Sequence, residues 1–448
     1  MNRFVRYVAL LALLLSVIGA VAVSAQETVN ITIRCKSSPP EEDWRCNNFA
    51  EVEEEVEAEL GIELNLTLLQ DNIDWGDYKN EFVLSSEAGT PPDIILSGHE
   101  DIGAWAAAGL IIPLDDQLDQ HPEFEDLVPT LWDSVRYKGQ IWGIPQDAEA
   151  RPIFYSKLLL ADLGWSEEEI ESLPERVLNG EFTFEDMIQT AKQAVDEGVV
   201  EEGNGYWHRT SNGPDFLYYY YGMGGEIETE DGVLIFDTEA ARKVYELFAR
   251  LVELGVTRPD MLGLDGNTVW HPGVASAEQV LFASGGTWNW PNWALNFVAD
   301  RGGNDYLMEN IGLTLIPAME TGQALTLTHP LVYMISSQSA HPDVALKLIA
   351  AVTTPEANNR HAIASFHLGI LQSQLESEEY INNPQISGAH YMLDHTTALP
   401  NNPYWGTWSE AYYTGIQASQ SGDLTPEEAV EAVVTQLQNE LGDNVIIR

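Results

Sequence analysis

Strand-like and helix-like segments alternate along residues 28–108, and this alternation constrains the fold more than any other feature. Thr28–Arg34 alternates β-branched and polar residues, which is typical of a strand. The segment from Asp43 to Leu60 has apolar residues at helical spacing and stops at Gly61. The pattern continues with strands at Ile62–Leu69 and Asp93–Leu96 and helices at Trp75–Glu87 and Ala104–Ala108. Strands separated by helices of this length form βαβ units, so the sequence predicts an α/β fold with a parallel sheet.

Later segments favour further helices and two more strands. A helix is expected over Phe184–Glu197, capped by Thr183 with Asp186 three residues on, and another from Asp237 or Thr238 to Leu254. Strands are expected at Ile311–Ile316 and Leu331–Ile335, and helices at Pro342–Val352, Pro355–Ala364, Trp405–Ser419 and Pro426–Leu441. No repeat or Pro/Ser-rich linker divides the sequence. A chain of more than 400 residues therefore has one unusually large domain or crosses between domains more than once.

The first 25 residues are typical of a secretory signal peptide. Arg3 and Arg6 make the start positive, Val8–Val23 is apolar and uncharged, and Val23-Ser24-Ala25 offers small residues before Gln26. An uncleaved membrane anchor is the alternative, since the apolar run is just short of the roughly 20 residues that span a bilayer. No cysteine follows the cleavage point directly. The sequence predicts an exported protein, in the periplasm or at the cell surface, that is not a lipoprotein.

The two cysteines, Cys35 and Cys46, lie close together in the sequence. In an exported protein such a pair favours a disulfide. In the chain-entropy model, closing so short a loop stabilises the fold by roughly 3 kcal/mol. A pair of buried free thiols is the alternative. A zinc site is disfavoured, because two cysteines without a nearby histidine do not complete a tetrahedral shell.

The charge balance is strongly acidic. There are 21 Lys and Arg residues against 70 Asp and Glu, a net charge of −49. A field of this sign repels phosphate backbones and anionic headgroups, so a nucleic-acid partner is excluded. With 44% hydrophobic residues, the chain can bury a large core rather than remain disordered.

Catalytic and metal-binding signatures are missing. The sequence has no Gly-x-Ser-x-Gly elbow, no His-Glu-x-x-His and no Walker loop. Gly222–Gly225 lacks the strand-then-helix context of a nucleotide loop and is interpreted as a turn. Asp71–Phe82 is faintly like a calcium loop, but Ile73 and Phe82 stand where oxygen ligands are required. A glycosidase-like carboxylate pair stays open, because 70 acidic residues make some such pair inevitable.

Aromatic residues gather beside polar turn residues. Thr287–Trp293 holds three indoles directly after Gly285 and Gly286, and Tyr404–Trp408 follows a Pro- and Asn-rich turn. An indole face stacks on a sugar ring, while acids and amides hold its hydroxyls. Trp288 and Trp290 are therefore predicted to form a ligand surface, whereas Tyr218–Tyr221 is predicted to be core.

Several short segments, in a fixed order, resemble one known family. They are Ala88–Ile95, Ala108–Asp116, Tyr137–Pro145, Phe154–Lys157, Glu278–Trp288, Gly312–Pro317 and Ser421–Ala429. Together they make the chain similar to the extracellular solute-binding proteins of ABC importers, in the group that includes maltodextrin-binding and other sugar-binding proteins. The similarity runs along essentially the whole mature chain.

The resemblance implies a two-lobed periplasmic-binding-protein fold. Each lobe is expected to be a mainly parallel sheet flanked by helices, and the lobes are discontinuous and joined by a hinge. The expected crossings lie near Gln146–Ala148, near Pro317 and near Thr353–Pro355. The N-terminal lobe is predicted to comprise residues 26–146 and 318–353, and the C-terminal lobe 147–317 and 354–448.

The resemblance also implies ligand-binding positions in the cleft between the lobes. Trp288 stands where similar proteins stack an indole on the sugar, Trp290 belongs to the same motif, and Glu149 and Glu100 match acidic ligand positions. Further candidates are Trp405, Trp408, Asp43, Trp44, Arg209, Asn212 and Asp215. Ser97 stands where maltodextrin binders have a Trp, so a different sugar is expected.

The functional hypothesis is a monomeric, non-enzymatic receptor that captures a mono- or oligosaccharide and delivers it to the permease subunits of an ABC transporter. It includes no catalytic residue, cofactor, metal or nucleic acid. Two alternatives stay open. One is the same fold with a polyamine or a glycerol phosphate as ligand, and the other is a secreted carbohydrate-active enzyme.

Overall fold

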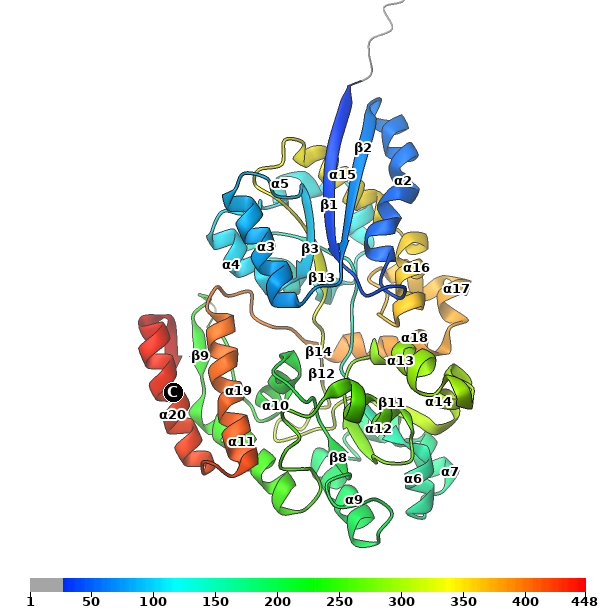
Figure 1. The fold of residues 1–448 in the computed structure, drawn as a ribbon, viewed down its shortest axis with the longest axis vertical. Helices are drawn as coiled ribbons and strands as arrows, with labels where there is room; N and C mark the ends of the chain where they lie inside the picture. Colours follow the sequence, from blue (N-terminus) through cyan, green and yellow to red (C-terminus); the bar gives the residue numbers. More distant parts are fainter. Residues whose placement is uncertain (1–26, 230) are drawn as a thin grey trace, which may run out of the picture.

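The computed structural model describes residues 27–229 and 231–448. The predicted signal peptide, residues 1–25, lies outside the described residues. The chain forms two α/β lobes, with the N-terminal lobe at the top of Figure 1 and the C-terminal residues in the lower lobe. Within residues 27–229 and 231–448, no helix is both long enough and apolar enough to cross a membrane.

The N-terminal lobe contains a five-stranded sheet in the order β2-β1-β3-β13-β6. β1 (Thr28–Lys36) pairs in parallel with β2 (Glu63–Asp71) and β3 (Ile94–Gly98). β13 (Leu331–Ile335) runs antiparallel to both β3 and β6 (Ile144–Pro145). The flanking helices include α2 (Trp44–Leu60), α3 (Trp75–Glu87), α4 (Asp101–Ala107) and α15 (Pro342–Val352), as Figure 1 shows.

The C-terminal lobe contains a four-stranded sheet in the order β11-β7-β10-β8. β7 (Ile153–Ser156) is antiparallel to β11 (Ile311–Thr314) and β10 (Phe282–Ser284), and β10 is parallel to β8 (Tyr206–Trp207). The α/β class is confirmed. Both sheets are mixed rather than mainly parallel, because strands that enter a sheet after a long connection, such as β13 and β11, run opposite to their neighbours.

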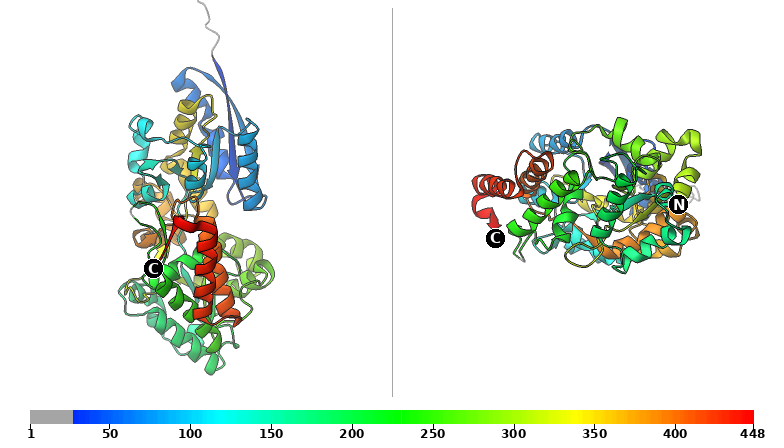
Figure 2. Two further views of the ribbon diagram at one scale, coloured as in Figure 1. Left: turned by 90° about the vertical axis from the view of Figure 1, so that its left-hand side faces the viewer. Right: turned by 90° about the horizontal axis from the view of Figure 1, so that it is seen from below.

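The remaining elements surround these sheets. The helices are α5 (Asp115–Leu118), α6 (Lys157–Asp162), α7 (Glu167–Glu171), α8 (Leu173–Leu178), α9 (Phe184–Asp196), α10 (Leu217–Gly222), α11 (Thr238–Glu253), α12 (His271–Ala275), α13 (Asn289–Asn292), α14 (Asn304–Asn310), α16 (Pro355–Ser365), α17 (Glu378–Ile381), α18 (Pro384–Ala389), α19 (Trp405–Ser421) and α20 (Pro426–Leu441). The short strands are β4 (Arg136–Tyr137), β5 (Gln140–Ile141), β9 (Leu234–Phe236), β12 (Thr326–Leu327), β14 (Thr396–Thr397) and β15 (Val445–Ile447). α19 and α20 lie side by side along one flank (Figure 2).

Local sequence signals explain where several helices begin and end. α9 begins with the predicted capping box, in which Thr183 and Asp186 exchange hydrogen bonds. Asp237 caps α11 by accepting from the backbone N–H groups of Glu239 and Ala240. α2 ends at Gly61, whose φ of 69° suits a glycine. The disulfide between Cys35 on β1 and Cys46 on α2 is present, with 5.9 Å between the Cα atoms.

Three stretches of chain meet between the two sheets. Residues 146–152 join β6 to β7, and residues 315–330 join β11 to β13. The third stretch follows α16, where Leu368 forms a β-bridge with Ala148. The first two are also joined, because the Arg151 backbone N–H donates to Thr326 Oγ1 at 2.8 Å. α16 itself packs against α2 of the N-terminal lobe, with Asn48 donating to the Ala357 carbonyl.

Candidate ligand-binding site

A cavity of about 400 Å³ lies between the lobes, and we call it the inter-lobe cavity. The N-terminal lobe supplies Lys36, Ser38, Glu42, Arg45, Trp75, Lys79 and Glu100. The first crossing supplies Glu149 and Arg151, and the C-terminal lobe supplies Arg209, Asn212, Gly213, Pro214 and Trp288. His329 comes from the second crossing, Leu331 from the start of β13, and His367 from the stretch after α16. Its size falls within the roughly 300–1,000 Å³ of pockets that hold small ligands.

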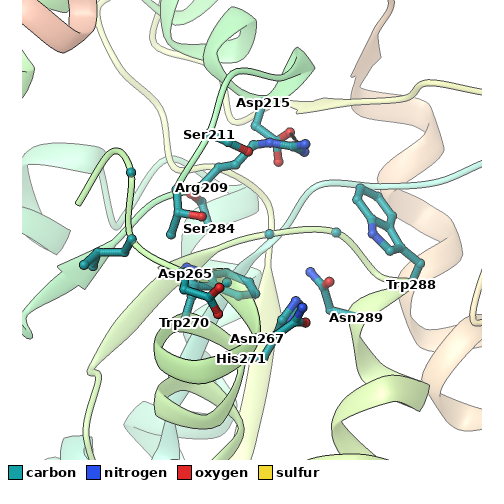
Figure 3. A pocket seen from close by; sticks show the side chains of 16 residues that line it. Arg209, Ser211, Asp215, Asp265, Asn267, Trp270, His271, Ser284, Trp288 and Asn289 are labelled. Atoms are coloured by element: carbon teal, nitrogen blue, oxygen red, sulfur yellow. Dashed lines mark hydrogen bonds and ion pairs between the residues drawn. The ribbon is translucent and has the colours of Figure 1, made fainter. Parts of the chain in front are cut away.

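A second cavity of about 590 Å³ lies within the C-terminal lobe and shares Arg209 and Trp288 with the first. Figure 3 shows Ser211, Asp265, Asn267, Trp270, His271, Ser284 and Asn289 around it. Trp293 Nε1 donates to His271 Nδ1 at 2.9 Å, and burial lowers the pKa of His271 to about 4. The His271 ring is therefore neutral at pH 7 with its proton on Nε2.

The carboxyl ends of three parallel strands position the N-terminal wall of the inter-lobe cavity. Lys36 ends β1, Trp75 begins α3 after β2, and Glu100 follows β3. The Nζ atoms of Lys36 and Lys79 lie 5.4 and 5.8 Å from the Trp75 ring centroid. The carboxyl ends of strands in an α/β sheet commonly form ligand sites, because their loops meet at one edge.

Glu100 is held as a carboxylate by two basic side chains. Glu100 Oε1 lies 2.6 Å from Lys79 Nζ, and Oε2 lies 2.5 Å from His329 Nε2. Burial alone would raise the pKa of Glu100, but His329 and Lys79 hold it well below its usual value. Burial raises the pKa of the neighbouring Asp101 to about 6, with Lys79 opposing and Glu100 adding to the rise. Glu100 is thus an ionised acceptor at the cavity wall.

Glu149, Arg151 and Trp288 form the opposite wall. Arg151 places one guanidinium nitrogen 2.5 Å from Glu149 Oε1 and its Nε 3.4 Å from Asp215 Oδ2. The Arg151 Cζ atom lies 4.8 Å from the Trp288 ring centroid, a cation–π distance. Asp215 also accepts from Arg209 at 3.0 Å. The wall therefore combines an indole with fixed hydrogen-bonding groups, as recognition of a polar ligand requires.

A buried ionic cluster lies behind the cavity at the crossings. Asp147 accepts from Arg45 at 2.8 Å, and His361 Nε2 and His367 Nε2 lie 3.4 and 3.8 Å from the same oxygen. Asp147, His361 and His367 have the donor types of a metal site. The Arg45 guanidinium already occupies the position beside Asp147, and it also lies 3.4 Å from His367 Nε2. We therefore interpret the cluster as an ion pair with two buried histidines.

Six of the predicted site residues lie at the cavities. Trp288, Glu149, Glu100, Arg209 and Asn212 line the inter-lobe cavity, and Asp215 lines the second one. Trp288 lines both cavities, and its ring lies parallel to that of His367 at 6.2 Å.

Five predicted site residues line neither cavity. Trp290 is buried, donates to Asn304 Oδ1 and packs near Phe154 and Phe366. Trp405 and Trp408 are also core residues, because α19 packs this face against α11 and Trp408 Nε1 donates to the Ile235 carbonyl. Asp43 accepts from Ser37 Oγ, and Trp44 lies beneath Arg360. These residues pack in the core or contact neighbouring side chains, and we propose no ligand contact for them.

Sequence reasoning missed twelve residues of the inter-lobe cavity, seven of them basic or aromatic. These seven are Lys36, Arg45, Trp75, Lys79, Arg151, His329 and His367, and the others are Ser38, Glu42, Gly213, Pro214 and Leu331. Lys36 and Trp75 could have been found, because they follow the predicted strands at their carboxyl ends. The rest have no local signal in the sequence.

Comparisons with known proteins agree with this architecture. The family model for bacterial extracellular solute-binding proteins matches residues 50–359. A maltotriose-binding protein of Pyrococcus abyssi is 21% identical over 379 residues, covering 82% of this chain and 74% of that protein. A cyclic α-maltosyl-1,6-maltose binding protein of Arthrobacter globiformis is structurally similar, with a TM-score of 0.72 at 18% identity over 92% of this chain and 98% of that one. An ABC transporter solute-binding protein of Thermotoga lettingae, bound with α-D-tagatose, has a TM-score of 0.68 and 18% identity. The match covers 93% of this chain and 100% of that one.

Proposed function

The chain belongs to the bacterial extracellular solute-binding proteins, and from this premise we propose that it is a carbohydrate receptor of an ABC importer. The receptor holds a mono- or oligosaccharide in the inter-lobe cavity and delivers it to the permease subunits. The ligands of similar proteins, maltotriose and α-D-tagatose among them, support a carbohydrate as the ligand class.

One observation carries the proposal. Two indoles, Trp75 and Trp288, line the same cavity from opposite lobes, together with the carboxylates of Glu100 and Glu149. Trp75 is 38% exposed, so part of this large apolar side chain is accessible beside the cavity. Aromatic faces that take the apolar side of a sugar ring, beside acids that accept from its hydroxyls, form a carbohydrate site.

Delivery requires a change between open and closed lobes. The cavity wall comes from both lobes, so a ligand that contacts both sides favours the closed arrangement. The proposed hinge consists of the three stretches of chain between the sheets, which are joined by the Ala148–Leu368 β-bridge and the hydrogen bond from Arg151 to Thr326. We keep the predicted lobe boundaries, 26–146 with 318–353 and 147–317 with 354–448, as part of the proposal, except that α16 is assigned to the N-terminal lobe because it packs on α2.

The proposed protein is exported, monomeric and without enzymatic activity.

The cavity carboxylates already have basic partners, since Lys79 and His329 hold Glu100 and Arg151 holds Glu149. A polyamine would have to displace these partners, which disfavours that alternative. No cofactor or metal is part of the proposed function.

Calorimetric titration with a panel of mono- and oligosaccharides tests the proposal. Tryptophan fluorescence, followed in parallel, would report a ligand that approaches Trp75 or Trp288. We expect saturable heat with at least one sugar and no product release. Silence across the panel, or release of sugars from a polysaccharide, would contradict the carbohydrate-receptor function.

A further inference from the structure

Cationic side chains outnumber acidic ones in the wall of the inter-lobe cavity. Five of the 21 Lys and Arg residues line it, against three of the 70 Asp and Glu residues. The cations are Lys36, Arg45, Lys79, Arg151 and Arg209, and the acids are Glu42, Glu100 and Glu149. The wall of the cavity therefore has more cations than acids, whereas the chain as a whole has far more acids than cations.

Four of these five cations already have carboxylate partners. Arg45 lies 2.6 Å from Glu42, Lys79 lies 2.6 Å from Glu100, and Arg151 lies 2.5 Å from Glu149. Arg209 pairs with Asp215 at 3.0 Å. Their charges are compensated within the protein, so they can hold ligand hydroxyls without requiring a charged ligand.

Lys36 has no such partner. It is only 6% exposed, and among residues 27–229 and 231–448 no carboxylate lies within 4.0 Å of its Nζ. Its hydrogen-bond partner is Asn72 Oδ1 at 3.3 Å, and its Nζ lies 5.4 Å from the Trp75 ring centroid. An amide oxygen and an aromatic face compensate a buried ammonium only in part. The site thus holds a desolvated positive charge that a ligand could neutralise.

We propose that the ligand is an acidic sugar, a uronate, whose carboxylate binds Lys36 in the inter-lobe cavity. This inference rests on the carbohydrate function proposed above and names the class of sugar. A charge-assisted hydrogen bond between carboxylate and ammonium is stronger than one between neutral groups, and it is strongest where water is excluded. Ser38 and Trp75 lie beside Lys36 in the cavity wall, available to a hydroxyl and to the sugar ring.

The fold holds Lys36 in place before any ligand arrives. Its neighbour Cys35 is joined to Cys46, and Lys36 is in register with Asp71 in the β1–β2 pair. Burial lowers the pKa of Lys36, Arg45 adds to this, and the more distant carboxylates of Glu42, Asp74 and Asp71 oppose it only in part. A bound carboxylate would favour the ammonium form and so reinforce its own binding.

Calorimetric titration of the full mature chain with matched sugars tests this inference. The probes are D-glucuronate against D-glucose, D-galacturonate against D-galactose, and short oligosaccharides of each, at pH 7. We expect at least a tenfold preference for one uronate over its neutral counterpart. Lys36→Met should abolish that preference and Lys36→Arg should keep most of it. The control is Lys192→Met, since Lys192 pairs with Asp196 on α9 and lines neither cavity.

The outcomes separate this inference from the broader proposal. If a neutral sugar binds as tightly as its uronate, the inference is overturned while the carbohydrate function stands. If a sugar phosphate binds more tightly than any uronate, the carboxylate assignment is also overturned. If no sugar of any kind binds, the carbohydrate function itself fails. If Lys36→Met does not fold, the affinities of the native chain for each uronate and its neutral counterpart still test the inference.

Discussion

The guanidinium of Arg151 lies over the indole of Trp288, with 4.8 Å between Cζ and the ring centroid. Arg151 belongs to the first crossing and Trp288 to the turn after β10, so the contact joins the proposed hinge to the ligand surface. The same Arg151 also contacts Glu149 and Asp215. A displacement of the crossing would therefore move the indole and the carboxylate of one wall together.

Trp288→Ala should weaken sugar binding by about tenfold, because it removes the indole shared by both cavities. Trp290→Phe is the matched control. It removes the donor to Asn304 and part of a buried ring, so the free energy of unfolding should fall by about 1–3 kcal/mol with little change in affinity. Calorimetry and urea unfolding measure the two effects. Equal losses of affinity in both variants would contradict the assignment of Trp288 to the ligand surface and of Trp290 to the core.

Glu100→Gln should reduce sugar affinity about tenfold and leave the fold intact. The variant removes the charge that Lys79 and His329 contact, but Lys79 keeps Asp101 at 2.9 Å. A receptor shows only this loss of affinity, whereas an enzyme with Glu100 in its active site would lose turnover. Titration is therefore paired with an assay for sugar release from polysaccharides. Release by the native chain that disappears in the variant would support the enzyme alternative.

Much of the fold could be predicted from the sequence, because the signals that delimit helices are local. Proline at the first helical turn marks the starts of α15 and α20, and a capping box marks that of α9. The antiparallel pairing of β13 with β3 could not be predicted, because β13 joins this sheet only after the chain returns from the other lobe, and no local pattern gives its direction.

The site was harder to predict, because an aromatic residue looks the same in a core and in a ligand surface. Trp288 follows a Gly-Gly turn and Trp408 a Pro- and Asn-rich one, but Trp408 packs near Tyr220 and Tyr412 whereas Trp288 lines a cavity. The missing counter-ion of Lys36 depends on distances between elements far apart in the sequence. No local pattern carries that information.

Replacing Cys35 and Cys46 together with alanine should lower the free energy of unfolding by about 3 kcal/mol, the loop-closure contribution of a link between residues 11 apart. Sugar affinity should fall as well, because the linked loop carries Lys36, Ser38 and Arg45 to the cavity wall. Urea unfolding and titration of oxidised, reduced and double-alanine protein measure both effects. An unchanged affinity in the folded variant would show that the loop is positioned without the link.

Acidification should destabilise the protein through buried neutral histidines. His208 Nδ1 donates to the Arg209 carbonyl and its Nε2 accepts from Gln420, while burial lowers the pKa to about 4. The unfolded chain, with a histidine pKa of about 6.5, binds a proton that the folded chain does not. The stability is therefore complete above about pH 6.5 and is lost as the pH falls toward 4, about 2 kcal/mol for this site at pH 5. Urea unfolding at pH 7.5 and 5 should show a smaller difference in His208→Gln, and an identical difference would contradict the assignment.

Asp147→Asn should destabilise the connection between the lobes, because it removes one of the two carboxylate partners of the buried Arg45 and leaves it only Glu42, at 2.6 Å. Asp147 Oδ2 accepts from Arg45, and Oδ1 accepts from the Leu331 backbone N–H at 2.8 Å. An asparagine can keep the second bond but not the ion pair, so we expect a loss of about 3 kcal/mol. Arg45→Met removes the guanidinium that Asp147 binds, so Asp147→Asn should cost less stability in that background than in the native chain. Urea unfolding of the four proteins gives the coupling energy. Strict additivity would show that the pair does not stabilise the crossings.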